Sequence, residues 1–256
     1  MADLETRVED GALWLTLNRP EVYNALSDSM ADDLAAVIEQ ATADDAVRVV
    51  VVTGAGDAFS AGADISGPDA HEHFDESTLD RANRIIRAIT TLDKPVVAAV
   101  NGVAAGIGCS AALAADIAVA RESASFLLAF ARIGLMPDGG STATFAAAIG
   151  RARAMRMSLL AEPLGAREAY DAGLIALVVP DDEFEAEVAR VVRHLAGGPP
   201  LAFAASKLAI NAATLHELDA ALERERTGQT VLLRTADLAE GMRAFVEKRR
   251  PVFRGD

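Results

Sequence analysis

Two stretches rich in glycine and alanine could present backbone N–H groups to a ligand. They read TGAGDAFSAGADI over residues 53–65 and NGVAAGIGCS over residues 101–110. Each follows an apolar run typical of a buried strand and leads into a helical pattern, and small side chains leave the backbone uncovered. N–H groups at a helix N-terminus lack partners within the helix and favour a negatively charged oxygen. Either stretch alone could be a simple turn, but the pair indicates two donors for one oxyanion.

Nucleotide binding is the alternative role for these glycines. Gly54-Ala55-Gly56 follows a predicted strand, but Phe59 stands where the third glycine of GxGxxG belongs. The sequence also contains no phosphate-binding loop of the form GxxxxGKS or GxxxxGKT. Both nucleotide interpretations are therefore weak.

The elements that must position these stretches alternate between strands and helices. Strands are predicted at 12–17, 47–53, 96–100, 117–120 and 175–179, and helical segments at 27–41, 79–92, 108–115, 141–160 with a break at Gly150, and 163–173. This alternation predicts an α/β core. Beyond Asp181 only helical patterns follow. We therefore expect an α/β core over residues 1–200 and a helical C-terminal region over residues 201–256.

The charge of the chain limits its partners. Its 256 residues carry 38 acidic and 24 basic side chains, a formal net charge of −14. That field repels phosphate backbones and anionic lipid, so we expect neither nucleic acid nor a membrane surface as a partner. No apolar run approaches the ~20 residues that span a bilayer, and Met1–Glu9 holds no apolar secretory segment. Cys109 is the only cysteine, which suits a reducing compartment, and we expect a cytoplasmic protein.

Several segments, in matching order along almost the whole chain, resemble the enoyl-CoA hydratase/isomerase (crotonase) family. They read NRPEVYNAL at 18–26, AFSAGADI at 58–65, KPVVAAVNGVAAGIGCSAALAADIAVA at 94–120, IGLMPDGGST at 133–142 and FVEKRRPVFRG at 245–255. The resemblance implies a spiral of ββα repeats, a helical C-terminal trimerisation region, and a homotrimer or dimer of trimers. It also implies an acyl-CoA thioester as substrate, with no metal and no cofactor beyond the coenzyme A of the substrate.

The resemblance assigns roles to individual residues. It implies that the N–H groups of Ala63 and Ile107 hold the thioester oxygen. The family commonly has glycine where Ile107 stands, but isoleucine donates equally well if its side chain points away. Coenzyme A is expected along Val22, Ala25, Ala61, Asp64, Ile65, Gly106 and Phe130. Lys248 of a neighbouring subunit is the candidate for the phosphates. The alternative for this basic C-terminus is a solvated helix end.

Two positions depart from the hydratases of this family. Those enzymes use two glutamates, because hydration needs one group to take a proton from water and another to give a proton to carbon. Here alignment of the surrounding glycines puts Ser110 and Phe130 at these positions. Serine can orient a water or a polar acyl group but is no base near neutral pH, and phenylalanine is inert. Ordinary hydratase activity is therefore in doubt.

Asp138 is the carboxylate left in the aligned active-site turn. Related isomerases, including the ring-isomerase branch of phenylacetyl-CoA catabolism, carry an acid in this turn. Moving a double bond needs only one base, which removes a proton from one carbon and returns it to another. The alternative is that Asp138 is a turn or capping residue for the helix beginning near Ser141. Asp64 and Asp116, at a helix start and a strand edge, are expected to be structural.

Other residues with reactive side chains fit structural roles better. His71-Glu72-His73 suggests a metal, but histidines two residues apart do not share a helix face, and an exposed acidic loop is the better account. Ser110 lacks the following glycine of a GxSxG nucleophile. Cys109 is expected to be a small buried residue. Lys207 and Asn211, one turn apart, are expected to steady the C-terminal helices.

Three functions remain open from the sequence. The leading one is an enzyme that isomerises or otherwise processes an enoyl-CoA through a thioester enolate. The second is a residual hydratase that uses Asp138 and a water bound to Ser110. The third is a catalytically silent relative that holds acyl-CoA or a protein partner.

Overall fold

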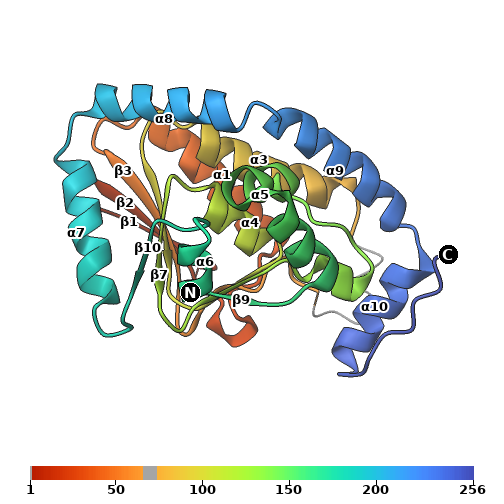
Figure 1. The fold of residues 1–256 in the computed structure, drawn as a ribbon. Helices are drawn as coiled ribbons and strands as arrows, with labels where there is room; N and C mark the ends of the chain where they lie inside the picture. The colour runs from red at the N-terminus through yellow and green to blue at the C-terminus, as the bar shows by residue number, and fades with distance from the viewer. Residues whose placement is uncertain (1, 66–73) are drawn as a thin grey trace.

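The computed structural model describes residues 2–65 and 74–256 and has two parallel-rich β-sheets surrounded by helices (Figure 1). The larger sheet has the strand order β1-β2-β3-β5-β7-β10. Its pairs are parallel apart from the antiparallel pair of β1 and β2. These strands are β1 (Leu4–Glu9), β2 (Ala12–Leu17), β3 (Val49–Gly54), β5 (Val96–Val100), β7 (Ile117–Arg121) and β10 (Leu177–Val179).

The smaller sheet includes one short strand from each of the two glycine-rich stretches, residues 53–65 and 101–110. Its order is β4-β6-β8-β9. The strands are β4 (Ala58–Ser60), β6 (Val103–Ala105), β8 (Ser125–Leu127) and β9 (Leu164–Gly165). Strands β4 and β6 pair in parallel. The carboxyl ends of parallel neighbours meet at one edge, so the residues after β4 and after β6 emerge side by side.

Helices cover both faces of the larger sheet. On one face, α7 (Phe184–Ala196) packs Val188 and Val191 against Val49 and Val97. The other face belongs to the main core, which includes the helices α1 (Asp28–Gln40), α3 (Glu76–Thr91), α4 (Ile107–Ala114), α5 (Ser141–Leu160) and α6 (Ala166–Asp171). Short 3-10 helices are η1 (Pro20–Val22), η2 (Ala41–Ala43) and η3 (Ala129–Ile133). Strands buried on both faces explain the continuous valine runs of the sequence.

Three further helices complete the chain: α8 (Pro200–Thr214), α9 (Leu218–Leu232) and α10 (Ala236–Val246). Helices α8 and α9 run along the outer side of the helical layer, and α10 lies beyond α9 (Figure 1). Helix α9 packs against α3 and α5, and α10 packs against η3. The helical C-terminal region is thus in contact with the α/β core. The division of the chain between residues 200 and 201 remains a prediction.

Most predicted elements occur within a few residues of their expected limits. Ser27 caps α1 by accepting a hydrogen bond from the Met30 N–H at 3.3 Å, and Gly150 breaks the ideal geometry of α5 with φ 75°. The segment predicted as helical at 163–173 instead begins with β9 and becomes helical at Ala166. Strands β1, β4, β6 and β8 were not predicted; three of them have only three residues, and β1 buries only Leu4.

Candidate active site

The two glycine-rich stretches lie against each other, backbone to backbone. Asn101 joins them, because its Oδ1 accepts from the Gly54 N–H at 3.1 Å and its Nδ2 donates to the Gly56 carbonyl at 2.8 Å. Gly62, with φ 95°, approaches so closely that a Cβ atom there would lie 2.9 Å from the Ala105 carbonyl oxygen and 3.4 Å from Gly106 Cα. Glycine at position 62 is what allows the turns after β4 and β6 to meet.

The Ala63 N–H is left free at this junction. Its neighbours are engaged: the Leu26 N–H donates to the Gly62 carbonyl at 2.7 Å, and the Asp64 N–H donates to the Leu26 carbonyl at 3.0 Å. In extended chain, successive N–H groups point to opposite sides. The Ala63 N–H therefore points away from Leu26, and within the described residues it donates to no acceptor.

The second free donor is at the start of α4. Ile107 is the first residue of this helix, after Gly106 with φ 52°. Its N–H has no partner within the helix, because the turn N-terminal to it is not helical. The Ile107 side chain lies against Gly139, where a Cβ atom would be 2.5 Å from Ile107 Cδ1. The isoleucine at this position thus directs its side chain to the 136–142 turn.

Asp138 lies in that turn, buried beside α4. Ser110 of α4 donates its hydroxyl to the Asp138 carbonyl at 2.9 Å. The carboxylate Oδ2 accepts from Gln229 Nε2 of α9 at 3.0 Å, while Oδ1 is buried without a partner among the described residues. The side chain is only 9% exposed. An acid with one oxygen tethered and one without a partner therefore lies in a turn that contacts α4 at Ile107 and at Ser110.

Burial raises the pKa of Asp138 to about 7, because desolvation disfavours the charged form. The hydrogen bond from Gln229 lowers this pKa, and the negative charge of Glu225 raises it. A carboxyl group with a pKa near neutrality can both take up and release a proton.

The Asp138 side chain does not cap α5, because its carboxylate accepts from Gln229 instead. The cap of α5 is Gly140, with no side-chain hydrogen bond of its own. Glu225 of α9 supplies the acceptor instead. Its two oxygens take the Gly140 N–H at 2.7 Å and the Thr142 N–H at 2.9 Å, together with the Thr142 hydroxyl at 2.5 Å.

Gln229 and Glu225 were missed by the sequence analysis, although the sequence carries a signal for them. The buried face of α9 is formed by Leu218, Ala221, Leu222, Glu225 and Gln229. Spacings of three and four residues continue the apolar stripe into the two polar residues. Polar side chains in an apolar stripe need buried partners, and here the partners are in the 136–142 turn.

Phe130 and Ser110, which the resemblance aligns with the two hydratase glutamates, are both buried. Phe130 is 8% exposed, and its ring approaches the Gly106 turn, with Cζ 4.0 Å from where a Gly106 Cβ would be. Ser110 is fully buried, and its hydroxyl proton is used by the Asp138 carbonyl. The structure thus brings six predicted residues together: Ala63, Gly106, Ile107, Ser110, Phe130 and Asp138.

The residues predicted along coenzyme A form a neighbouring group. The Ala61 N–H donates to the Tyr23 carbonyl at 2.9 Å, which ties the segment after β4 to η1. Val22 ends η1, Ala25 follows it, and Ile65 follows Asp64. Asp64 is paired with Arg19 at 2.8 Å, in accord with a structural role. Lys248 follows α10 and is exposed; no hydrogen bond or ion pair among the described residues joins it to the other predicted site residues.

Other side chains singled out by the sequence are structural where they can be seen. Cys109 is buried, and burial raises its pKa to about 12. Lys207 pairs with Asp116 at 2.8 Å and donates to the Ile89 carbonyl, and Asn211 donates to the Thr90 carbonyl. His71, Glu72 and His73 lie outside the described residues. Within residues 2–65 and 74–256 no group of His, Cys, Asp or Glu could hold a metal, and no helix is long and apolar enough to cross a membrane.

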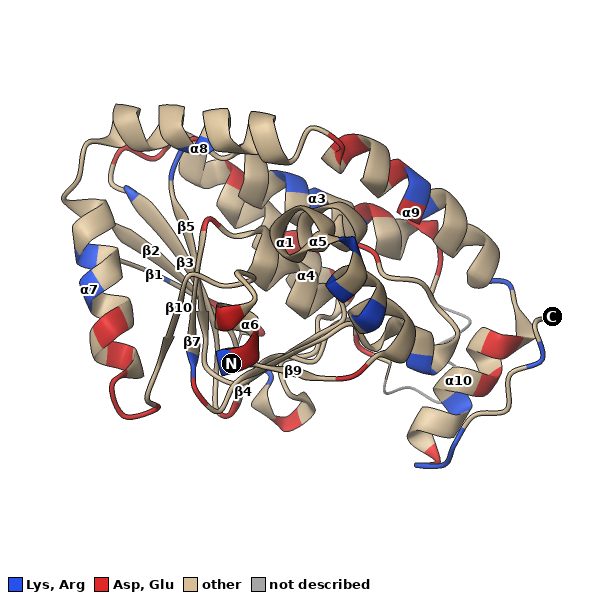
Figure 2. Ribbon diagram, in the orientation of Figure 1, with Lys and Arg blue, Asp and Glu red and all other residues tan. Residues whose placement is uncertain are grey.

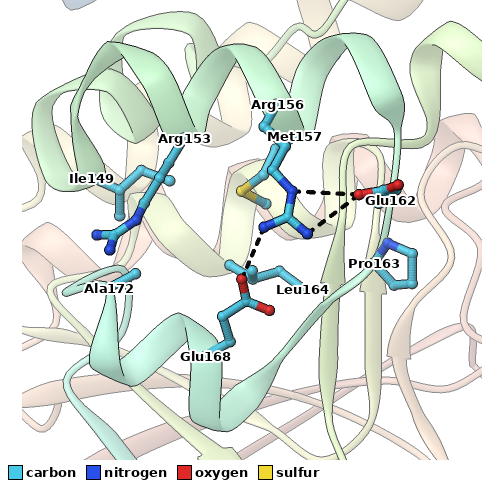
Figure 3. Close-up of a pocket in the computed structure, with 9 residues that line it drawn as sticks. All are labelled: Ile149, Arg153, Arg156, Met157, Glu162, Pro163, Leu164, Glu168 and Ala172. Carbon is cyan, nitrogen blue, oxygen red and sulfur yellow. Dashed lines mark hydrogen bonds and ion pairs between the residues drawn. The ribbon is translucent and has the colours of Figure 1, made fainter.

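A shallow pocket lies away from this site, between α5 and α6 (Figure 3). Arg156 extends across it to Glu162 and Glu168, with ion pairs of 3.3 and 3.1 Å. Three of its charged groups, Arg156, Glu162 and Glu168, are thus already paired with one another. None of the predicted site residues lines it.

Comparison with known proteins identifies the family of the chain. The chain matches the model of the enoyl-CoA hydratase/isomerase family over residues 7–256. It is 45% identical to a probable enoyl-CoA hydratase of Rhodobacter capsulatus, over 97% of this chain and 96% of that protein. It is also 40% identical to the 1,2-epoxyphenylacetyl-CoA isomerase of Escherichia coli, over 98% and 97% of the two chains. A crystal structure of an enoyl-CoA hydratase from Mycobacterium avium subsp. paratuberculosis superposes with a TM-score of 0.94 at 49% identity and 99% coverage of both chains.

The chain therefore belongs to the enoyl-CoA hydratase/isomerase family and has its fold. The family supports an enzyme acting on an acyl-CoA thioester. The similar proteins include both a hydratase and an isomerase by name, so similarity alone does not choose between the two reactions.

Proposed function

We propose that this protein is an enoyl-CoA isomerase in which Asp138 is the single base and the N–H groups of Ala63 and Ile107 form the oxyanion hole. The observation that carries the proposal is the buried Asp138 carboxyl group, which has one oxygen free in the turn packed on Ile107. The residues at the two hydratase glutamate positions, Ser110 and Phe130, cannot exchange protons near neutral pH.

The proposed reaction moves one proton and leaves no net change in composition. Ionised Asp138 takes a proton from a carbon of the acyl chain, and the electron pair moves into the thioester carbonyl as an enolate. The two N–H groups stabilise the oxygen, an effect of about 10²–10³ in rate for each donor. Protonated Asp138 then returns the proton to a different carbon, so the double bond is displaced. The pKa of Asp138 near 7 suits both directions of this transfer.

A residual hydratase remains the second candidate. It would use Asp138 together with a water held by Ser110. The Ser110 hydroxyl already donates to the Asp138 carbonyl, so it can offer a water only its acceptor lone pairs. This contact favours the isomerase. The third candidate is a silent acyl-CoA-binding protein, which would remove no proton from the acyl chain.

For the coenzyme A arm, we propose the segment formed by Val22, Ala25, Ala61, Asp64 and Ile65, next to the two turns. Lys248 from a neighbouring subunit would meet the phosphates, and this requires the protein to assemble as a trimer or a dimer of trimers. Calorimetry is expected to show tighter binding of an acyl-CoA than of the free acid. Equal affinity would contradict this part of the proposal.

Asp138→Asn tests the single-base mechanism. Asparagine keeps the size and the hydrogen bonding of the turn but cannot accept the proton, so the turnover rate should fall by about 10²–10⁴. Acyl-CoA affinity, measured by calorimetry, should change far less. Near-normal turnover on the best substrate from a panel of enoyl-CoA thioesters would sink the mechanism.

Ser110→Ala and solvent deuterium uptake separate the three candidates. The serine variant should lose little activity if Ser110 only supports the turn, but most of its activity if Ser110 holds the attacking water. Deuterium from the solvent should enter the acyl chain whenever protonated Asp138 exchanges with water before it returns the proton. A silent binding protein exchanges nothing.

A further inference from the structure

Helix α9 belongs to the C-terminal helical region rather than to the α/β core, yet it contacts the turn that contains Asp138. Its buried polar residues, Glu225 and Gln229, both contact the 136–142 turn from outside the core. Gln229 is fully buried and Glu225 is 1% exposed. Glu225 accepts from the first N–H groups of α5, and the proton transfer itself uses neither side chain.

We propose that Gln229 is a positioning residue for Asp138, holding Oδ2 so that Oδ1 is presented to the substrate, and that Gln229 and Glu225 together set the protonation state of this carboxyl group. The proposal rests on the proposed role of Asp138 as the base.

The orientation of the Gln229 amide is fixed by two different partners. Its Oε1 accepts from the Met136 N–H at 3.1 Å, so its Nε2 must be the atom that donates to Asp138 Oδ2 at 3.0 Å. Both partners lie in one turn, two residues apart. The contact with Met136 prevents the amide from turning over, and the contact with Asp138 prevents rotation of the carboxyl group about χ2. The free Oδ1 is the direct result.

Glu225 acts on the same carboxyl group through its charge. Burial raises the pKa of Glu225, and three donors act against this by favouring the ionised form: the Gly140 N–H and the N–H and hydroxyl of Thr142. Among the described residues, Glu225 is the charged side chain whose field acts on Asp138. From α4, the turn receives only the neutral side chains of Ile107 and Ser110.

The two residues have opposite effects on the base. A donor on Oδ2 favours the ionised form of Asp138, while a neighbouring negative charge disfavours it. A role that was only structural would not produce opposite signs in the two variants. Opposite signs are therefore the observable that separates this proposal from simple packing of α9.

Gln229→Met and Glu225→Gln test the proposal in the full-length protein. In Gln229→Met, the pH at which kcat reaches half its maximum should rise by about one unit, because one hydrogen bond to an ionised group is lost. At pH 7 this lowers kcat about fivefold, with KM changed less than twofold. In Glu225→Gln the same midpoint should move to lower pH. Val231→Ala, an exposed position two residues beyond Gln229 on the same helix, should leave the profile unchanged.

A readout without substrate keeps the test independent of activity. The ¹³C carboxyl resonance that disappears in Asp138→Asn reports the pKa of Asp138 directly, and it should shift in the same opposite directions in the two variants. Gln229→Glu, which adds a negative charge, is the second variant if Gln229→Met does not fold, and it should raise the pKa further. Unmoved or equally moved titrations in folded variants overturn the role of α9, whereas active Asp138→Asn overturns the proposed function itself.

Discussion

At the scale of single residues, the main feature of the site is a buried carboxyl group, Asp138, whose charged form is disfavoured by desolvation. The sequence indicated Asp138 as a candidate because related isomerases carry an acid in the turn that this segment resembles. The sequence does not say how strongly that acid is desolvated, because its hydrogen-bond partner Gln229 is 91 residues away. Similarly, the sequence shows that the Ser110 hydroxyl can orient a water or an acyl group, but not that it donates to the Asp138 carbonyl. The sequence identified Asp138 as a candidate base, but its hydrogen-bond partner could not be predicted because it depends on how α9 packs.

The raised pKa of Asp138 predicts a pH dependence of stability. The unfolded carboxyl group titrates near the ordinary value of 3.8, and the folded one titrates at about 7. Between these values the folded state binds more protons, so its free energy of unfolding falls as the pH rises. Asp138→Asn has no such titration. Its stability relative to the wild type should therefore increase by about 2–3 kcal/mol between pH 5 and pH 8.

Denaturant unfolding of both proteins at the two pH values, at one protein concentration, measures this difference. Asp116 is present in both proteins, so its titration largely cancels, whereas Glu225 interacts with Asp138 and contributes to the measured difference. A stability difference that is the same at pH 5 and pH 8 would mean that Asp138 is already ionised in the folded protein at pH 5.

At the scale of elements, the long and periodic segments were the predictable ones. Strand β5 has the limits that the sequence predicts, Val96–Val100, and the break of α5 at Gly150 was expected from the glycine. The strands β4, β6 and β8 were missed because three residues carry too little pattern. These short strands nevertheless bring the two donor turns together. The sequence located the turns by composition, while their alignment depends on pairing between distant segments.

Gly62→Ala tests the contact between the turns. A Cβ atom at position 62 would lie 2.9 Å from the Ala105 carbonyl oxygen, and alanine is strained at φ 95°. We expect a stability loss of about 1–3 kcal/mol. We also expect a loss of turnover of about 10² or more, because separating the turns displaces one oxyanion donor. Thermal unfolding and steady-state kinetics measure the two effects.

Gly165→Ala is the matched control, since a Cβ atom there meets nothing within 4 Å and φ is −66°. This variant should keep both its stability and its turnover. If Gly62→Ala is as active as this control, the Ala63 N–H is not held in place by the close approach of the turns.

At the scale of the whole molecule, charge is distributed unevenly over the C-terminal helices. Helices α9 and α10 carry residues of both signs, whereas α8 is almost free of charge (Figure 2). The one charged residue of α8, Lys207, is buried against Asp116. Two apolar residues seven positions apart, and so on the same side of α8, are Leu201 and Leu208, which are 85% and 46% exposed. An exposed apolar surface on a chain with 24% charged residues marks a surface for association.

We therefore expect this face of α8 to contact a second copy of the chain in a threefold assembly. Light scattering should give about 80 kDa for a trimer or about 160 kDa for a dimer of trimers, three or six times the chain mass of 26.7 kDa. The double variant Leu201→Glu/Leu208→Glu places two charges on this apolar face, and desolvating them in an interface is costly. It should shift the mass toward 26.7 kDa while the far-ultraviolet circular dichroism is retained. Val8→Glu, at a half-exposed position of β1, is the control and should leave the assembly intact. A monomeric wild-type protein at micromolar concentration would contradict the assembly, and an intact trimer of the double variant would place its interface away from α8.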